Sequence, residues 1–268
     1  MFIAFADESE VVTQSVPMVG VGGAIASGKQ WERIAKVWRK VLKTEPDVKV
    51  FHANEFATPE GRERSVYKDW SLDRCKDFGG KLINTLCKNH VELVSVATVK
   101  PSDYAEVVAS WPRPIPPIFN AHYFCATWLL IQHKLWLDKF FPDQKITYYF
   151  ESGGPHQTGM QTAYRDALNK RGVDEFFHFT REPAFVPKDT YLELQVADNL
   201  VYEATKRSSH YLDPDPPEKH SVPHPEIENA RLWNVRYAAD KWQESGMQID
   251  VQWYNKRGIR DSFEMWKL

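Results

Sequence analysis

Three carboxylates occupy positions where α/β proteins build ligand sites. Asp7 ends the apolar run at residues 2–6, and Glu151 ends the apolar run at residues 146–150. Ligands of open α/β sheets gather at the carboxyl ends of strands, so these two acids could share one site if the two strands are parallel neighbours. Each acid could also be an ordinary turn or helix-cap residue, and spacing alone does not decide between the two interpretations.

A third acid, Asp198, is predicted on the apolar face of a late helix. Helical spacing places it on one face with Leu194, Ala197, Val201 and Ala204. An ionised carboxylate facing a core is costly unless it is paired or bound to a metal. Together the three acids predict a site for Mg²⁺ or Mn²⁺, which prefer oxygen ligands. The alternative for Asp198 is an ion pair with a buried Arg or Lys.

Four further residues are candidates for supporting roles. His52 could protonate a leaving oxygen or orient a phosphate near neutral pH, or could be a structural histidine that caps a helix or makes another hydrogen bond. Glu55 follows it by three residues. Gln195, one helical turn before Asp198, could position that carboxylate, or could be a structural amide. Glu8 is expected to point to the sheet face opposite Asp7 unless a bulge or turn intervenes.

The elements that position these residues alternate between strands and helices after an initial hairpin, which predicts a mixed α/β sheet covered by helices. The strands are expected at residues 2–7, 17–26, 91–99, 145–151 and 175–180, with a turn at 8–16. The helices are expected at residues 29–43, 71–89, 119–140, 157–171, 190–206 and 226–243. Proline-rich residues 211–225 are expected to form a loop.

Composition limits the partners of the protein. The chain has 268 residues, 43% hydrophobic and 26% charged, which is typical of a globular protein. The 34 Lys and Arg against 36 Asp and Glu give a net charge of −2, so nucleic acid would need a local basic patch. The expected helix at residues 29–43 offers one along its polar side, which could equally be an ordinary solvated face. Its basic residues are Lys29, Arg33, Lys36, Lys40 and Lys43.

The remaining expectations concern organisation and compartment. Three widely spaced cysteines favour free thiols in a reducing cytoplasm over a disulfide framework. No apolar stretch is long enough to cross a bilayer, so no membrane partner is expected. We expect one domain over residues 1–268, with a core at about 1–206 and a C-terminal loop and helical extension at 207–268.

Three short motifs resemble the signatures of the domain-of-unknown-function 3800 family, which read roughly D-E-S-G, F-H-A and Q-x-A-D. They are Asp7-Glu8-Ser9, Phe51-His52-Ala53 and Gln195-Val196-Ala197-Asp198. That family resembles the ribonuclease-H-like superfamily, whose acids on the first strand, a central strand and a late helix bind divalent metals for phosphodiester chemistry. The resemblance implies that Asp7, Glu151 and Asp198 are metal ligands. One departure is Glu10, where the family pattern has glycine.

The residues and the resemblance together predict a ribonuclease-H-like mixed β-sheet flanked by helices, with helical insertions. The expected function is that of a divalent-metal-dependent nuclease, or a related phosphoryl-transfer enzyme, acting on DNA or RNA. A binding or regulatory module that keeps the fold without turnover is the main alternative. A nucleotide-binding regulator that uses the same cleft is a third.

Overall fold

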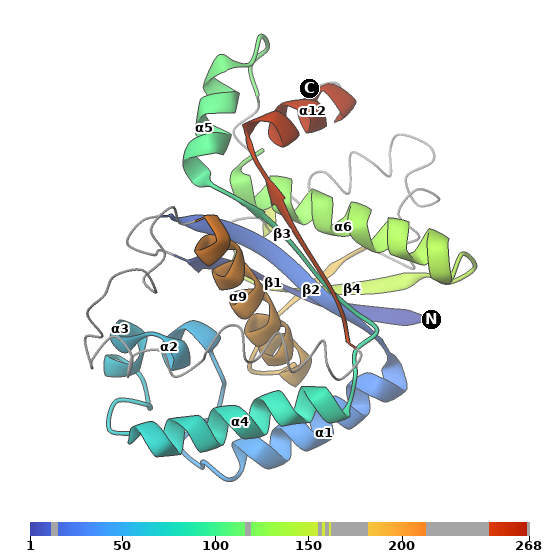
Figure 1. Ribbon diagram of the computed structural model, residues 1–268. Coiled ribbons are helices and arrows are strands. Elements are labelled where there is room, and N and C mark those ends of the chain that lie inside the picture. Colours follow the sequence, from blue (N-terminus) through green and yellow to red (C-terminus); the bar gives the residue numbers. More distant parts are fainter. Residues whose placement is uncertain are drawn as a thin grey trace.

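Six strands form one mixed sheet at the centre of the computed structural model (Figure 1), in the order β5-β4-β1-β2-β3-β6. The structure describes residues 1–11, 16–115, 119–154, 157–158, 161, 182–212 and 247–266. The strands are β1 (Phe2–Val11), β2 (Met18–Ser27), β3 (Leu93–Val99), β4 (Ile146–Glu151), β5 (Ala184–Val186) and β6 (Gln248–Tyr254). β1, β2 and β3 are antiparallel neighbours. β4 is parallel to β1, β5 to β4 and β6 to β3.

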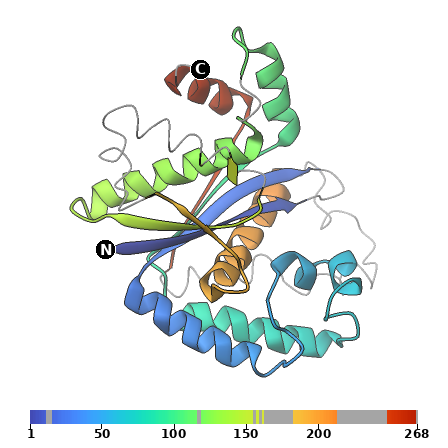
Figure 2. The same ribbon diagram turned by 180° about the vertical axis from the view of Figure 1, so that it is seen from behind.

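Helices cover both faces of this sheet, as the two opposite views show (Figures 1 and 2). The helices are α1 (Gly28–Leu42), α2 (Ala53–Ala57), α3 (Pro59–Glu63), α4 (Leu72–Lys88), α5 (Pro101–Ser110), α6 (Ala121–Phe140), α9 (Leu192–Leu212) and α12 (Lys256–Trp266). α9 packs directly on β1 and β2, with α1 and α4 behind it, whereas α6 packs on β2 and β3 from the other side. The general prediction of an α/β sheet flanked by helices is therefore confirmed.

Side-chain alternation along β1 assigns its residues to the two layers. Phe5 is buried in the cluster that contains α1, α4 and α9, whereas Ala4 and Ala6 are buried in the cluster that contains α6. Successive strand residues point to opposite faces. Asp7 therefore follows Phe5 onto the α9 side.

Two glycines of β2 allow α9 to lie close to the sheet. A Cβ atom at Gly20 would be 2.3 Å from the Thr205 side-chain oxygen of α9, and one at Gly22 would be 3.0 Å from Val201 Cγ2 of α9 and 2.8 Å from the backbone oxygen of Ser95. Real Cβ atoms do not approach other atoms that closely. These glycines therefore serve the packing of the helix that carries Asp198.

Several boundaries differ from those expected. β1 continues to Val11 and pairs with β2 as far as Val11 opposite Met18, so residues 8–11, which were expected in a turn, belong to the strand. α9 continues to Leu212, six residues past the expected end, and α5 was not expected. The sheet also extends beyond the expected core, because β6 pairs with β3 from Leu93 opposite Gln248 to Val99 opposite Tyr254. The strand expected at 175–180 and the helix expected at 226–243 lie outside the described residues, as does most of the helix expected at 157–171.

Candidate acidic site

Asp7 and Glu151 lie side by side because of the register between β1 and β4. Phe5 is opposite Tyr149 and Ala6 is opposite Phe150, so the next pair along these parallel strands is Asp7 and Glu151. Tyr149 packs in the same cluster as Phe5. The alternation of each strand thus directs both carboxylates to the α9 face. Asp7 lies at the carboxyl end of the β1–β4 ladder, although β1 itself continues beyond it.

Lys188, which the sequence did not suggest, lies at the centre of the site. Its Nζ is 2.9 Å from Asp7 Oδ2, 2.7 Å from Glu151 Oε2 and 3.2 Å from Asp198 Oδ2. Glu151 pairs with Val186 across the β4–β5 ladder, and Lys188 is two residues further on. Three neighbouring parallel strands therefore deliver Asp7, Glu151 and Lys188 to one end of the sheet.

The three acids meet as expected. All three oxygens lie within 3.2 Å of one nitrogen, so no two of them are further apart than twice that distance. Asp198 is 8% exposed, and the four apolar residues that were expected to share its helix face are buried. The alternative in which Asp198 pairs with a buried cation also describes this arrangement, since Lys188 is 7% exposed.

Hydrogen bonds from α9 hold the segment that follows α1. The Ala53 backbone N–H donates to Asp198 Oδ2 at 2.9 Å, and the Phe51 backbone N–H donates to Gln195 Oε1 at 3.0 Å. Gln195 Nε2 in turn donates to the backbone oxygen of Lys188 at 3.3 Å. Gln195 thus joins three segments of chain and positions the site through them.

The charges of the site act strongly on one another. Burial, opposed by Lys188 and assisted by the neighbouring acids, raises the pKa of Asp7 well above its ordinary value. Burial also acts to raise the pKa of Glu151, but the hydrogen bond from Asp7 and the charge of Lys188 lower it overall. Burial acts to lower the pKa of Lys188, and the three acids outweigh it and raise that pKa. Asp7 is accordingly the acid that keeps a proton most readily, and Lys188 is firmly protonated.

His52 and Glu55 lie at the border of the site. His52 precedes α2 without capping it through its side chain, so the helix-cap alternative does not hold. A positive charge on His52 is the smallest of the influences that lower the pKa of Glu151, after the hydrogen bond from Asp7 and the contacts with Lys188. Glu55 is exposed on α2. With burial as the main cause, Glu55 and Asp198 both raise the pKa of Tyr67, whose buried hydroxyl has no hydrogen-bond partner among the described residues.

Glu8 does not share the face of the three acids. β1 has no bulge, since Glu8 stays in register opposite Val21, and its side chain follows Ala6 to the α6 side. Its backbone N–H supports the site by donating to Asp7 Oδ1 at 2.8 Å. At the position of the family's glycine, Glu10 has its Oε1 3.0 Å from His122 Nε2 of α6. No tight turn occurs there, because β1 continues.

The donor set suits a hard divalent cation, with one conflict. Three carboxylates that converge from two strands and a helix are the ligands that Mg²⁺ and Mn²⁺ prefer. The point that they surround is taken by the Lys188 ammonium, at hydrogen-bond spacing rather than the roughly 2.0–2.6 Å of such metal bonds. The part of the chain that the structure describes contains no group of three or more His, Cys, Asp or Glu that could hold a metal ion as the side chains stand.

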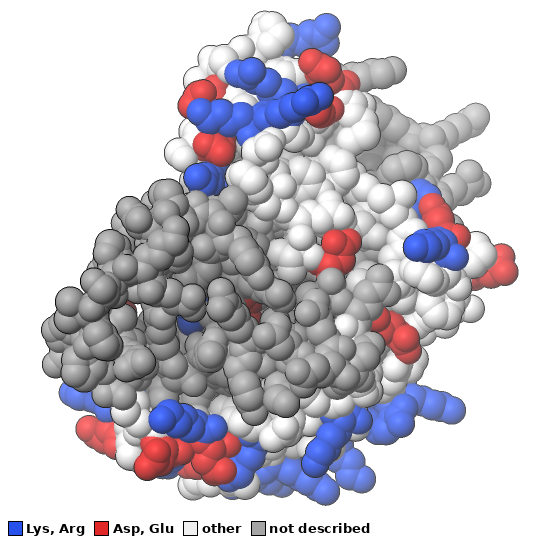
Figure 3. Space-filling model, in the orientation of Figure 1, with Lys and Arg blue, Asp and Glu red and all other residues white. Residues whose placement is uncertain are grey.

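The expected basic residues form an exposed stripe on α1, where Lys29, Arg33, Lys36 and Lys40 are all exposed, as is Lys43 just after the helix. Figure 3 shows Lys and Arg side chains gathered over α1 along the lower edge of the molecule. The buried side of the helix, with Trp31, Ile34 and Trp38, packs on the core. The stripe therefore faces outward, as predicted.

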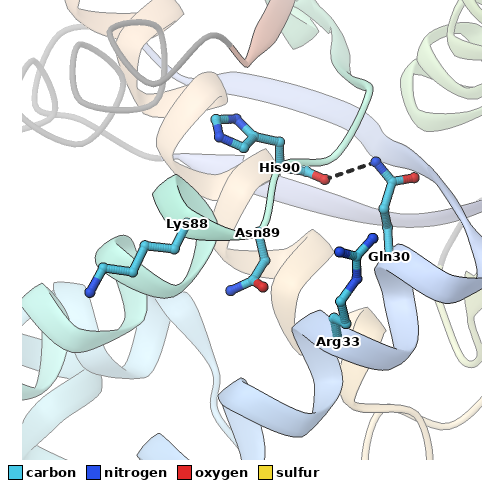
Figure 4. Close-up of a pocket in the computed structure, with 5 residues that line it drawn as sticks. All are labelled: Gln30, Arg33, Lys88, Asn89 and His90. Atoms are coloured by element: carbon cyan, nitrogen blue, oxygen red, sulfur yellow. Dashed lines mark hydrogen bonds between the residues drawn. The ribbon is translucent and has the colours of Figure 1, made fainter.

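A cavity of about 170 Å³ lies where this stripe begins, between the start of α1 and the end of α4 (Figure 4). It is lined by Gln30, Arg33, Lys88, Asn89 and His90. The Lys88 side chain points away from Arg33, so the basic groups do not close around one point (Figure 4). Ser27, which caps α1, is opposite Phe2 in the sheet, about five residues or 17 Å from Asp7. The cavity is thus separate from the acidic site.

Among the described helices, none is both long enough and apolar enough to span a membrane. Comparison of the chain with protein-family models, with curated proteins and with solved structures finds no match.

Proposed function

We propose that the protein is a divalent-metal-dependent nuclease, or a related phosphoryl-transfer enzyme, with a ribonuclease-H-like fold. The observation that carries the proposal is the convergence of Asp7, Glu151 and Asp198 from the first strand, a central strand and a late helix onto one point. This is the arrangement that the resemblance implies. The clamping of the Phe51–Ala53 segment onto Asp198 and Gln195 also supports it, because the three motifs meet in one place.

The residues of the site divide the chemistry among them. Asp7, Glu151 and Asp198 would hold Mg²⁺ or Mn²⁺, which when bound supplies an activated water and stabilises a leaving oxygen. His52, beside Glu151, would transfer a proton to the leaving oxygen near neutral pH. The exposed stripe on α1 would bind the phosphate backbone of DNA or RNA.

One observation favours the alternative, a binding module without turnover. Lys188 neutralises part of the acidic charge from within the protein. A module of this kind would keep Lys188 in place permanently and use the three acids only to stabilise the fold.

Cleavage assays separate these functions. Wild type and Asp198→Asn are incubated with single- and double-stranded DNA and RNA in Mn²⁺, Mg²⁺ or EDTA. We expect cleavage that requires metal and falls by more than about a hundredfold in Asp198→Asn, since even residues behind metal ligands contribute up to that much. Asp189→Asn removes an exposed acid next to Lys188 and should leave the rate unchanged.

Two results would contradict the proposal. Cleavage that persists in EDTA would exclude a metal mechanism. An absence of cleavage on all four substrates, by a protein that is folded and binds nucleic acid, would favour the binding module.

A further inference from the structure

The starting observation is an imbalance of charge around Lys188. One ammonium faces three carboxylates at 2.7–3.2 Å in a largely buried site. One positive charge cannot neutralise three ionised carboxyl groups in a site shielded from water, and burial together with the neighbouring acids raises the pKa of Asp7 despite Lys188. A divalent cation at the same point would balance the carboxylates better than Lys188 does.

The second observation is that the side chain of Lys188 can leave without its backbone. The Lys188 backbone oxygen is held by Gln195 Nε2 at 3.3 Å, which anchors the residue to α9. The neighbouring Pro187, Asp189 and Thr190 are exposed, so solvent lies close to the base of the lysine. The ammonium is carried on a flexible four-carbon stem, so leaving the acids requires rotations of that stem and no movement of the anchored backbone.

We infer that Lys188 is an intramolecular competitor of the divalent cation, which holds the three carboxylates together in the metal-free protein and moves out as the metal binds. This inference rests on the proposed function, because it assumes that the acids bind a metal. The lysine prevents the acids from repelling one another before loading. The same contact weakens metal affinity, because each metal ion must displace an ion-paired ammonium.

Direct metal binding tests the inference without any reliance on turnover. Mn²⁺ affinity is measured by calorimetry on wild type, Lys188→Met and Lys256→Met. Lys256 is a partly exposed lysine that pairs with Glu106, so its replacement removes the same charge elsewhere. We expect Lys188→Met to bind Mn²⁺ at least about tenfold more tightly than wild type, equivalent to about 1.4 kcal/mol. Lys256→Met should match wild type.

The possible outcomes distinguish this inference from the function on which it rests. Equal or weaker binding by Lys188→Met, with wild type binding normally, overturns the role of Lys188 and leaves the metal proposal standing. If neither protein binds Mn²⁺ at millimolar concentration, the metal proposal fails, and the competition fails with it.

A second measurement on the wild-type protein covers the case in which Lys188→Met does not fold. Lysine acetylation by an amine-reactive reagent is followed by mass spectrometry with and without saturating Mn²⁺. Lys188 should be protected in the metal-free protein and acetylated at least about tenfold faster with Mn²⁺, whereas exposed Lys145 should not change. Asp7→Asn, which lacks one ligand, should reduce the effect of Mn²⁺. If metal binds and the Lys188 rate stays the same, the lysine does not move out.

Discussion

Buried acids in this protein have two very different surroundings. Asp7 is 1% exposed and its carboxyl group lies 2.9 Å from the Lys188 ammonium, which opposes the effect of burial on the pKa of Asp7. Glu203 on α9 is 2% exposed, and neither of its carboxylate oxygens has a hydrogen-bond partner among the described residues. Burial raises the pKa of Glu203, and only Lys206 acts in the other direction. Asp7 therefore belongs to a charged site, whereas burial of Glu203 lowers the stability of the fold.

The pH dependence of stability should reveal Glu203. Its pKa is raised in the folded state, so its contribution is most favourable below the pKa of the unfolded chain, about 4.3, and is lost as the pH rises. Glu203→Gln cannot ionise and should raise the melting temperature at pH 7.5 by a few degrees, corresponding to about 1 kcal/mol. The gain should vanish below about pH 4.

Thermal melts of wild type and Glu203→Gln between pH 3.5 and 8 measure this effect. Glu32→Gln, a change at an exposed position of α1, serves as the control and should melt like wild type throughout. A melting temperature for Glu203→Gln below that of wild type at pH 7.5 would mean that the ionised carboxylate has a partner.

At the scale of elements, the site depends on α9, which binds two other segments through a single amide. Gln195 accepts from the Phe51 N–H and donates to the Lys188 backbone oxygen, and it is fully buried. α6 carries a contrasting residue, Gln132, which is 4% exposed and whose side-chain atoms have no hydrogen-bond partner among the described residues. The two glutamines differ in partners rather than in burial.

Replacing each glutamine by leucine should therefore have opposite consequences. Gln195→Leu leaves a buried backbone N–H and a carbonyl without partners, and should lower the free energy of unfolding by about 2–4 kcal/mol. Gln132→Leu removes an unsatisfied amide and should be neutral or stabilising by up to about 1 kcal/mol. Urea denaturation measures both. Similar losses in the two variants would show that side-chain shape, and not hydrogen bonding, decides their contribution.

The sequence was sufficient to predict the elements that carry the acids. The apolar runs that end at Asp7 and at Glu151 and the helical spacing around Asp198 are strong local patterns, and the structure places all three acids together. Lys188 was missed because β5 has only three residues, Ala184–Val186, too few for a periodic pattern. Its position depends on pairing with β4, which is a long-range property.

The edge strand β6 is not predicted from the sequence, for a different reason. β6 alternates apolar and polar residues, with Ile249, Val251 and Trp253 on one parity, which is an ordinary strand signal. It follows a long polar stretch, and the chain beyond residue 206 was interpreted as an extension for that reason. β6 pairs in parallel with β3, which is far from it in the sequence, so its place in the sheet cannot be predicted from neighbouring residues.

At the scale of the whole molecule, the basic stripe and the acidic site are related by the path of the chain. α1 begins beside the Phe2 end of the sheet, and the segment that follows it reaches Asp198 through Ala53. A helix of 15 residues is about 22 Å long, comparable with the distance of about 17 Å along β1 from Phe2 to Asp7. α1 therefore begins near one end of the sheet, and the segment that follows it lies against the acidic site.

The basic residues of α1 would offset the negative phosphate charges of a nucleic acid bound to this helix. Residues 28–43 contain six Lys or Arg and one acid, whereas the whole chain has a net charge of −2. Each lysine that touches a phosphate releases about one counterion, so binding weakens as salt rises. The double variant Lys36→Glu with Lys40→Glu should bind single- or double-stranded nucleic acid more weakly. Its salt dependence should be shallower by about one unit of slope for each lysine that no longer touches a phosphate.

A fluorescence-anisotropy titration at several salt concentrations measures affinity and slope together. The control carries the same charge change on the other side of the sheet, at exposed Lys139 and Lys145 near the end of α6 and the start of β4. The α1 variant keeps its apolar face, so both proteins should melt like wild type. If both variants lose affinity equally, only net charge matters and the stripe has no special role. If the α1 variant alone loses affinity and slope, the basic stripe on α1 is the binding surface for nucleic acid.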